Sequence, residues 1–162
     1  MRFHSAVAGL MVIMAMTPVA GQQIRKVNPP SVPKPVAAYS HVAEVPPGAR
    51  LLFLAGQVGN RPDGTLAPGI EDQAIQALDN IRAILAAEGA GPEHIVKMTI
   101  YAAARPADMG KIGAKRAEMF KGTAPPPSTW VYVSALARPE YLIEIEAVAA
   151  VPTKDMRAEH GR

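Results

Sequence analysis

The sequence contains no cysteine. This absence excludes disulfides, thiolate metal sites, a cysteine nucleophile and lipid attachment through an N-terminal cysteine. The zinc-deaminase signature needs paired cysteines and is therefore absent as well. Thiol chemistry and the common zinc chemistries are thus excluded.

Histidine is scarce, and its four copies, His4, His41, His94 and His160, are scattered along the chain. No two of them have the spacing of metal ligands. The chain also lacks the Gly-x-Ser-x-Gly elbow of serine hydrolases and a Gly-rich phosphate loop that opens a helix. We therefore predict no metal site.

Basic charge is present but is not concentrated. The formal net charge is +3 and the sequence pI is about 9.3. Lys111, Lys115 and Arg116 lie near Glu118, whereas a nucleic-acid surface usually needs a concentrated basic stripe. We expect no nucleic-acid partner.

No apolar run has the roughly 20 residues that a membrane-spanning helix needs. One run of about 15 residues, from Ala6 to Ala20, follows Arg2 and ends in small residues, which is the layout of a secretory signal. We expect residues 1–21 to be removed by cleavage after Ala20 or Gly21, with an uncleaved anchor as the alternative. The mature protein would then have no membrane span and would be periplasmic or secreted.

Composition divides the rest of the chain into three parts. Residues 22–38 are proline-rich and polar, and are expected to form an extended linker with no core of its own. Residues 39–152 have a globular composition and enough length for one well-buried core. Residues 153–162 form a polar tail.

Within residues 39–152 the hydrophobic pattern alternates between periods of 2 and 3.6, as a mixed layer structure requires. Strands are predicted at residues 40–45, 51–55, 95–102, 129–136 and 141–151, and helices at residues 71–88 and 106–120. The first two strands flank Pro46-Pro47-Gly48 and are expected to form a hairpin. The order β-β-α-β-α-β-β indicates an α+β fold with a single sheet and two helices on one face.

The second face of such a sheet would remain uncovered in a monomer. Val131, Val133, Ile143, Ile145 and Val148 alternate with polar or aromatic residues, which makes that face semi-apolar. We therefore expect the chains to associate through it.

Two short segments are candidates for a binding site. Ala55-Gly56-Gln57 ends a strand, where a glycine lets a ligand approach the backbone and an amide can both donate and accept. A strand end that runs into a turn explains this segment equally well. Glu144 and Glu146 share one strand face, roughly 7 Å apart, and could orient water or take a proton. Such pairs are more often simply solvated.

A third candidate is the segment from Ala124 to Val131, APPPSTWV, which contains the only tryptophan. Prolines cannot donate ladder hydrogen bonds, so the strand has to begin after Pro127 with Ser128 at its mouth. Ser128 and Trp130 then share one face. They could line a pocket, or the aromatic ring could fill a subunit contact.

Taken together, these segments resemble the Rid family of reactive intermediate deaminases, also called the YjgF/YER057c family and formerly described as L-PSP endoribonuclease-like. The resemblance spans about residues 39–151. It rests on Tyr39 before the first strand, LLFLAGQV, QALDNIRAILAAEGA, HIVKMTIYA, the proline-rich entry to the fourth strand, and LIEIEAVA. It implies a chorismate-mutase-like domain, a homotrimer whose sheets face inward, and small-molecule clefts between adjacent subunits.

In that family, the best-studied members hydrolyse enamine or imine intermediates of amino-acid metabolism to keto acids and ammonia, without metal or cofactor. An arginine at the start of the fourth strand binds the substrate carboxylate, and a glutamate on the last strand positions water. A tyrosine near the N-terminus and a backbone group beside the Gly-Gln turn complete the cleft. Tyr39, Gly56, Gln57 and Glu144 match these positions.

The family's arginine has no match in this sequence. The alignment that keeps the apolar pattern in register puts Ser128 at its position and Trp130 where the family often has cysteine. Gly113 stands where the deaminases often carry asparagine. A hydroxyl cannot make the forked contact of arginine with a carboxylate. An α-carboxylate substrate is therefore expected to bind roughly tenfold to a hundredfold less well, unless Arg61 or Arg116 supplies a substitute charge.

Two functions remain open on the sequence. One is a cofactor-free hydrolase of C–N bonds, in which Glu144 positions water and Gly56 and Gln57 hold the reacting group. The other is a non-catalytic binding module of the cell envelope for a neutral or aromatic small molecule, because Ser128 replaces the charged residue.

Overall fold

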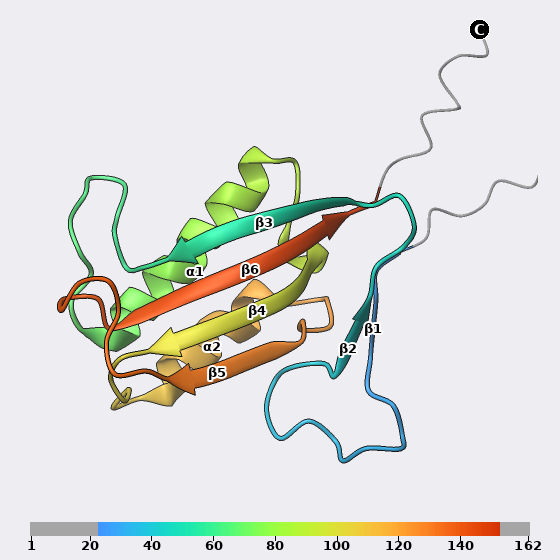
Figure 1. Ribbon diagram of the computed structural model, residues 1–162, viewed down its shortest axis with the longest axis horizontal. Helices are drawn as coiled ribbons and strands as arrows, with labels where there is room; N and C mark the ends of the chain where they lie inside the picture. Colours follow the sequence, from blue (N-terminus) through green and yellow to red (C-terminus); the bar gives the residue numbers. More distant parts are fainter. Residues whose placement is uncertain (1–22, 153–162) are drawn as a thin grey trace, which may run out of the picture.

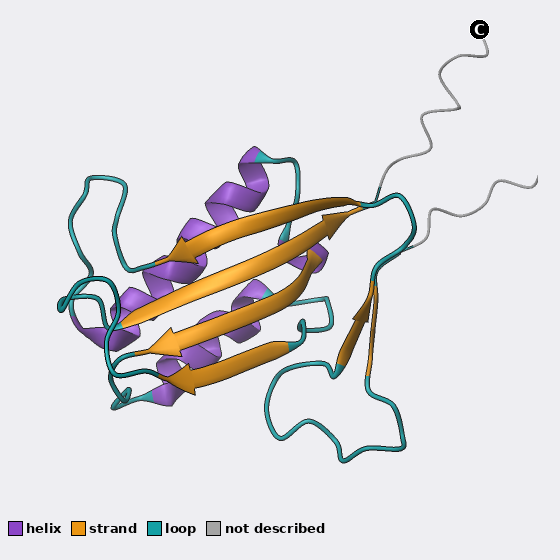
Figure 2. Ribbon diagram, in the orientation of Figure 1, coloured by secondary structure: helices purple, strands orange, loops and turns teal. Residues whose placement is uncertain are grey.

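A computed structural model describes residues 23–152. The predicted signal at residues 1–21 and the predicted polar tail at residues 153–162 lie outside the described residues. Two helices lie against one face of a four-stranded mixed sheet, and a small two-stranded sheet stands beside it (Figure 1). Figure 2 shows the same layers coloured by type of element. The predicted α+β fold with both helices on one face is confirmed.

The strands are β1 Arg25–Val27, β2 Val42–Glu44, β3 Arg50–Gln57, β4 Ile95–Ala102, β5 Ser128–Tyr132 and β6 Ile143–Val151. The helices are α1 Gly69–Ala87 and α2 Met109–Met119, and a 3-10 turn, Pro92–His94, precedes β4. The main sheet has the order β3-β6-β4-β5. β6 runs antiparallel to β3 and β4, and β4 and β5 are parallel. None of the helices in this part of the chain is long and apolar enough to cross a membrane.

The predicted hairpin between the first two strands is wrong. β2 pairs with β1, with Val27 opposite Val42, whereas β3 pairs with β6. β2 has three residues, while β3 and β6 have eight and nine, so β6 offers β3 a much longer ladder. The segment predicted as a linker therefore supplies a strand of its own.

α1 is the helix that covers most of the core. It ends before Gly89, whose φ of 67° is the left-handed conformation that glycine adopts readily. Each large apolar side chain that is fully buried contributes about 1.5 to 3 kcal/mol. The residues with the predicted helical spacing are all buried: Ala74, Ala77, Leu78, Ile81 and Leu85.

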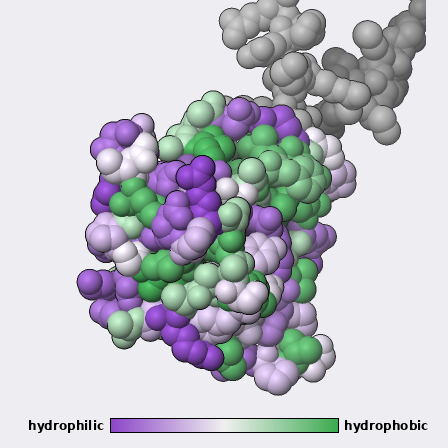
Figure 3. All heavy atoms as spheres, turned by 60° about the vertical axis from the view of Figure 1, so that its left-hand side comes forward, coloured by the Kyte–Doolittle hydropathy of each residue, from purple (hydrophilic) through white to green (hydrophobic). Residues whose placement is uncertain are grey.

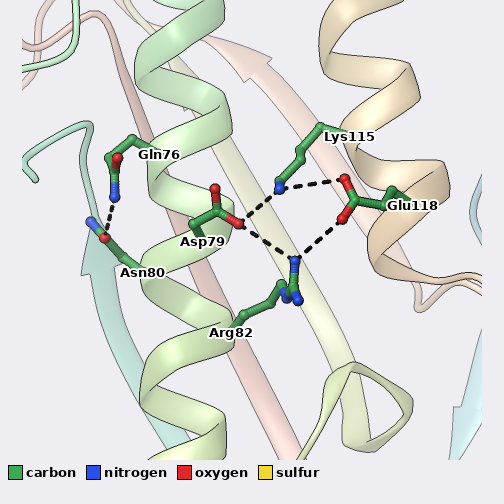
Figure 4. A network of polar contacts seen from close by, with 6 residues as sticks. All are labelled: Gln76, Asp79, Asn80, Arg82, Lys115 and Glu118. Atoms are coloured by element: carbon green, nitrogen blue, oxygen red, sulfur yellow. Dashed lines mark hydrogen bonds and ion pairs between the residues drawn. The ribbon is translucent and has the colours of Figure 1, made fainter.

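A network of ion pairs joins α2 to α1 (Figure 4). Lys115 Nζ lies 2.8 Å from Asp79 Oδ1 and 3.5 Å from Glu118 Oε2. Arg82 reaches the same two carboxylates at 3.6 and 3.5 Å. The hydrogen bond to Asp79 raises the pKa of Lys115. The network fixes the position of α2 at the turn that also carries Arg116.

The face of the main sheet opposite the helices is called here the open face. The sequence placed Ile143 and Ile145 on it, which is wrong because both side chains are buried in the core beneath the helices. The strand alternation then directs Val148 to the open face, where it lies opposite Phe53. Phe53 is 77% exposed and Leu51 is 48% exposed. When the molecule is turned so that the left-hand side of Figure 1 comes forward, its surface shows apolar residues interspersed with polar ones (Figure 3).

Candidate functional site

Three of the predicted site residues line one cavity on the helix side of the main sheet. Tyr39, Ser128 and Trp130 border a space of about 300 Å³, called here the helix-side cavity. Arg116 also borders it. The remaining walls come from α2, β4 and the segment before β2, and they are mostly apolar: Ala37, Ala38, Ile100, Met109, Ile112 and Gly113.

The register of β5 directs Ser128 and Trp130 into this cavity. Ser128 lies opposite Met98 and Trp130 opposite Ile100, and both partners are buried in the core beneath the helices. β5 begins at Ser128, as the prolines before it predict. Trp130 packs against the core, but its Nε1 has no hydrogen-bond partner among the described residues.

The segment around Tyr39 is held in place by hydrogen bonds on both sides. The Ser40 hydroxyl donates to the Pro125 carbonyl at 2.7 Å, and the His41 backbone N–H donates to Asn28 Oδ1 at 2.9 Å. The rings of Tyr39 and His41 meet edge to face at 5.5 Å. Residues 37–39 thereby become a wall of the cavity, although the sequence assigned residues 37 and 38 to a linker.

Arg116 brings a positive charge to the helix-side cavity. Its Nη2 donates to Ser128 Oγ at 3.1 Å and to the Ala38 carbonyl at 3.3 Å. Burial lowers the pKa of Arg116, but an arginine side chain stays protonated in proteins. The position left without an arginine on β5 is therefore in direct contact with an arginine on α2.

On the sequence alone, either Arg61 or Arg116 could supply the substitute charge. Arg61 donates to Thr65 Oγ1 and to the Leu66 carbonyl in the loop after β3, so its side chain is engaged locally. Arg116 lies on the stripe of α2 that carries the buried Ile112. A charged residue on a buried helical stripe is the sequence signal that identifies it.

The other predicted site residues meet on the open face. A Cβ added to Gly56 would overlap Glu144 Oε1, so the Glu144 side chain lies directly over the Gly56 backbone. We call these two residues the open-face pair. The adjacent Gln57 side chain turns back on its own strand, where its amide donates to the Ala55 carbonyl at 3.1 Å.

The two carboxylates of β6 differ in their partners. Glu146 accepts a hydrogen bond from the Tyr101 hydroxyl at 3.1 Å, and this bond raises the pKa of Tyr101. No side chain of residues 23–152 donates to the Glu144 carboxylate. Glu144 is thus the carboxylate that remains available to a water molecule or a ligand.

Within one chain, the helix-side cavity and the open-face pair lie on opposite faces of the main sheet. Ser128 and Trp130 point toward the helices, whereas Glu144 lies between Ile143 and Ile145, which occupy the helix side. The six predicted residues are therefore divided into two groups. In the described part of the chain, no three His, Cys, Asp or Glu side chains are placed to hold a metal ion.

Comparison with known proteins gives a consistent set of relatives. Residues 30–151 match the family model described as Endoribonuclease L-PSP. A RutC family protein of Pyrococcus horikoshii is 38% identical over 121 residues, which cover 74% of this chain and 91% of the relative. The Mus musculus protein named 2-iminobutanoate/2-iminopropanoate deaminase is 35% identical over 129 residues, which cover 78% and 91%. A crystal structure of a Rid-family protein of unknown function from Yersinia pestis has a TM-score of 0.72 and 33% identity, and covers 80% of this chain and 100% of that one.

Proposed function

Because the chain belongs to the endoribonuclease L-PSP family, the Rid family that its sequence resembles, we propose that it hydrolyses enamine or imine intermediates to a carbonyl compound and ammonia. The observation that carries this proposal is the open-face pair. The Glu144 carboxylate has no protein donor among residues 23–152 and lies over a glycine backbone. A free carboxylate in a fixed position is the group needed to orient water. The name of the mouse relative supports the same reaction.

The proposed reaction adds one water molecule across a C=N bond. Glu144 accepts a proton from the water, and the oxygen attacks the imine carbon to form a carbinolamine. This proton is passed to the nitrogen, and the carbinolamine hydroxyl then gives its own proton to the nitrogen through Glu144, so that the C–N bond breaks and ammonia leaves as the C=O bond forms. Gly56 lacks a side chain, so the Glu144 carboxylate can lie directly over its backbone, where it would meet the reacting group.

We propose that each cleft combines the open-face pair of one chain with the helix-side cavity of a neighbouring chain in a homotrimer. The two groups lie on opposite faces of one sheet, so association brings together what a single chain keeps apart. The exposed Phe53 and Leu51 on the open face give association an apolar surface. The resemblance to the Rid family implies the same arrangement.

The sequence also allowed a non-catalytic envelope module for a neutral or aromatic ligand. The apolar walls and Trp130 suit an aromatic group. A neutral ligand would leave the Arg116 charge without a counterion, which disfavours this alternative. A location in the periplasm or outside the cell remains a proposal that rests on the predicted signal.

RNA cleavage, which the name of the family model suggests, is not the reaction we propose. An RNA surface needs clustered cations that are free to contact phosphates. The described cations are dispersed, and several are engaged in ion pairs of their own: Arg25 with Glu44, Arg50 with Glu88 and Arg138 with Glu140.

The test generates imino acids with an amino-acid oxidase and traps the surviving imine with semicarbazide. We expect the wild-type protein to lower the trapped fraction for at least some of a panel of amino acids. Glu144→Gln removes the base without changing its size, and a general base contributes about a hundredfold or more to a rate. We expect a loss of that order with unchanged thermal unfolding.

The matched control is Glu146→Gln on the same strand and the same face, which we expect to keep most of the activity. The proposal fails if the wild-type protein accelerates the decay of no imine in the panel. It also fails if Glu144→Gln accelerates the decay as much as the wild type does.

A further inference from the structure

The Arg116 guanidinium has no counterion in the described chain. Both of its contacts are to neutral oxygens, Ser128 Oγ and the Ala38 carbonyl. The ion pairs found within residues 23–152 all use other cations. A partly buried charge without a counterion is unfavourable. The missing partner is an anion that residues 23–152 do not provide.

Most of the guanidinium is free to bind that anion. Arginine has five N–H donors. Nη2 makes both recorded contacts, and the Nε and Nη1 hydrogens have no partner in the described part of the chain. Those contacts hold the planar group in one orientation. A guanidinium held in this way can make the forked contact that suits a carboxylate.

Gly113 leaves room for the anion beside the guanidinium. It lies three residues before Arg116 on α2, so the two residues share one face of the helix. A Cβ added to Gly113 would meet no heavy atom within 4 Å. Lys115, the residue directly before Arg116, forms an ion pair with Asp79 and holds this turn of α2 in place (Figure 4).

The rest of the cavity selects the body of the ligand. Its walls include Ile100, Met109, Ile112 and Trp130, which are apolar or aromatic. The space of about 300 Å³ is that of a small-molecule site. The Trp130 N–H is a further donor that lacks a partner among the described residues. An anion attached to an apolar or aromatic group fits this combination.

We propose that Arg116 is the carboxylate-binding residue of the cleft, held by Ser128, and that the substrate is an imino or enamino acid with an apolar or aromatic side chain. This inference rests on the proposed function for the imine group and deepens it by naming the cation and the substrate class. The positive charge is supplied by α2, whereas the arginine of the Rid family lies at the start of the strand that corresponds to β5. Ser128 is then a positioning residue, because its hydroxyl orients the guanidinium.

The test is calorimetric titration of the purified protein with phenylpyruvate, an aromatic 2-oxo acid, and with its methyl ester as the neutral probe. We expect the wild-type protein to bind the acid roughly tenfold or more tightly than the ester. Arg116→Met keeps an unbranched side chain, and we expect it to weaken acid binding about tenfold to a hundredfold while leaving the ester unchanged.

Three further variants separate the effect of the charge from an effect on folding. Arg61→Met removes a cation outside the cavity, and we expect it to bind the acid as the wild type does. Arg116→Met combined with Ser128→Arg returns an arginine to the wall of the same cavity, and we expect it to regain acid binding. Arg116→Lys keeps the charge without the fork, and we expect intermediate affinity if Arg116→Met does not fold.

Equal acid affinity in the wild type and Arg116→Met overturns the inference, and so does a wild-type protein that does not bind the acid. Because binding is measured independently of hydrolysis, a failure of this inference can be distinguished from a failure of the proposed reaction. If no imine is hydrolysed but Arg116→Met loses acid binding, the inference stands and the proposed reaction fails. If hydrolysis occurs and Arg116→Met leaves both KM and acid binding unchanged, the inference alone fails.

Discussion

Gly56 shows how much of the site depends on the absence of a side chain. The space above its Cα is occupied by the Glu144 carboxylate. Gly56→Ala would force that carboxylate to move, and a misplaced catalytic group loses up to about a hundredfold in rate. We expect imine hydrolysis to fall at least about tenfold, measured as the initial rate in the semicarbazide assay.

Because both substitutions act through one carboxylate, Gly56→Ala combined with Glu144→Gln should be no slower than Glu144→Gln alone. A wild-type rate in Gly56→Ala would contradict this role of the glycine. A double variant whose two losses add would contradict it as well.

The sequence predicts single residues well where strict alternation fixes their faces. The pattern Ile-Glu-Ile-Glu predicts that the two glutamates share one face of the strand and the two isoleucines the other, and the structure agrees, although the isoleucines were assigned to the wrong face of the sheet. The role of Arg116 could be predicted only in part. Its stripe on α2 is visible in the sequence, but the cavity beneath it depends on β5 and on residues 37–39, which come from distant parts of the chain.

At the scale of elements, one carboxylate connects the starts of the two helices. Glu71, in the first turn of α1, accepts hydrogen bonds from the backbone N–H groups of Ala107 at 2.6 Å and Asp108 at 3.0 Å. Asp108 in turn caps α2 by accepting from the Gly110 N–H at 2.8 Å. The bond from Asp108 is the main reason that the pKa of Glu71 is lowered.

Acid should therefore weaken the connection between the helices. The pKa of Glu71 lies below its ordinary 4.5 in the folded chain, so its stabilising contribution is complete above about pH 4.5 and is lost as the pH falls through the lower folded value. We expect Glu71→Gln to be less stable than the wild type at neutral pH, with a difference that shrinks in acid. Urea unfolding at neutral pH and at about pH 3 measures this difference.

Asp72→Asn is the matched control, because Asp72 is also an acidic residue of the first turn of α1. We expect its effect on stability to be smaller than that of Glu71→Gln. An identical stability loss for Glu71→Gln at both pH values would show that the carboxylate charge is not what holds the two helix starts together.

The elements could be predicted because their signals are local, whereas their partners could not. Pro127 and Gly89 mark where β5 begins and α1 ends, and both boundaries depend only on nearby residues. The partner of β3 is β6, about 90 residues away, and no local signal names it. The hairpin prediction failed for this reason.

At the scale of the whole molecule, the open face is the surface through which we propose that copies of the chain associate. Phe53→Asp would place a charge in the apolar part of this face, where burial without a partner is strongly unfavourable. We expect the variant to dissociate from homotrimer toward monomer at micromolar concentration, to stay folded and to lose imine hydrolysis. Sedimentation velocity and native mass spectrometry measure the assembly.

Val36→Asp is the control for this substitution, because Val36 is 94% exposed and lies outside the main sheet. We expect it to leave the assembly unchanged. A Phe53→Asp protein with the wild-type mass and activity would exclude the open face as the surface of association.

We propose that one cleft takes Glu144 from one chain and Arg116 from its neighbour. Co-expression of Glu144→Gln and Arg116→Met chains with different tags, followed by isolation of the mixed assemblies, tests it directly. Each parent assembly is expected to be strongly impaired. In each mixed homotrimer, one of the three clefts receives Glu144 from one chain and Arg116 from its neighbour, so the isolated mixed assemblies should regain about a third of the wild-type rate of imine hydrolysis. If both residues served the cleft of a single chain, no assembly would contain an intact site, and the mixture would be no more active than its parents.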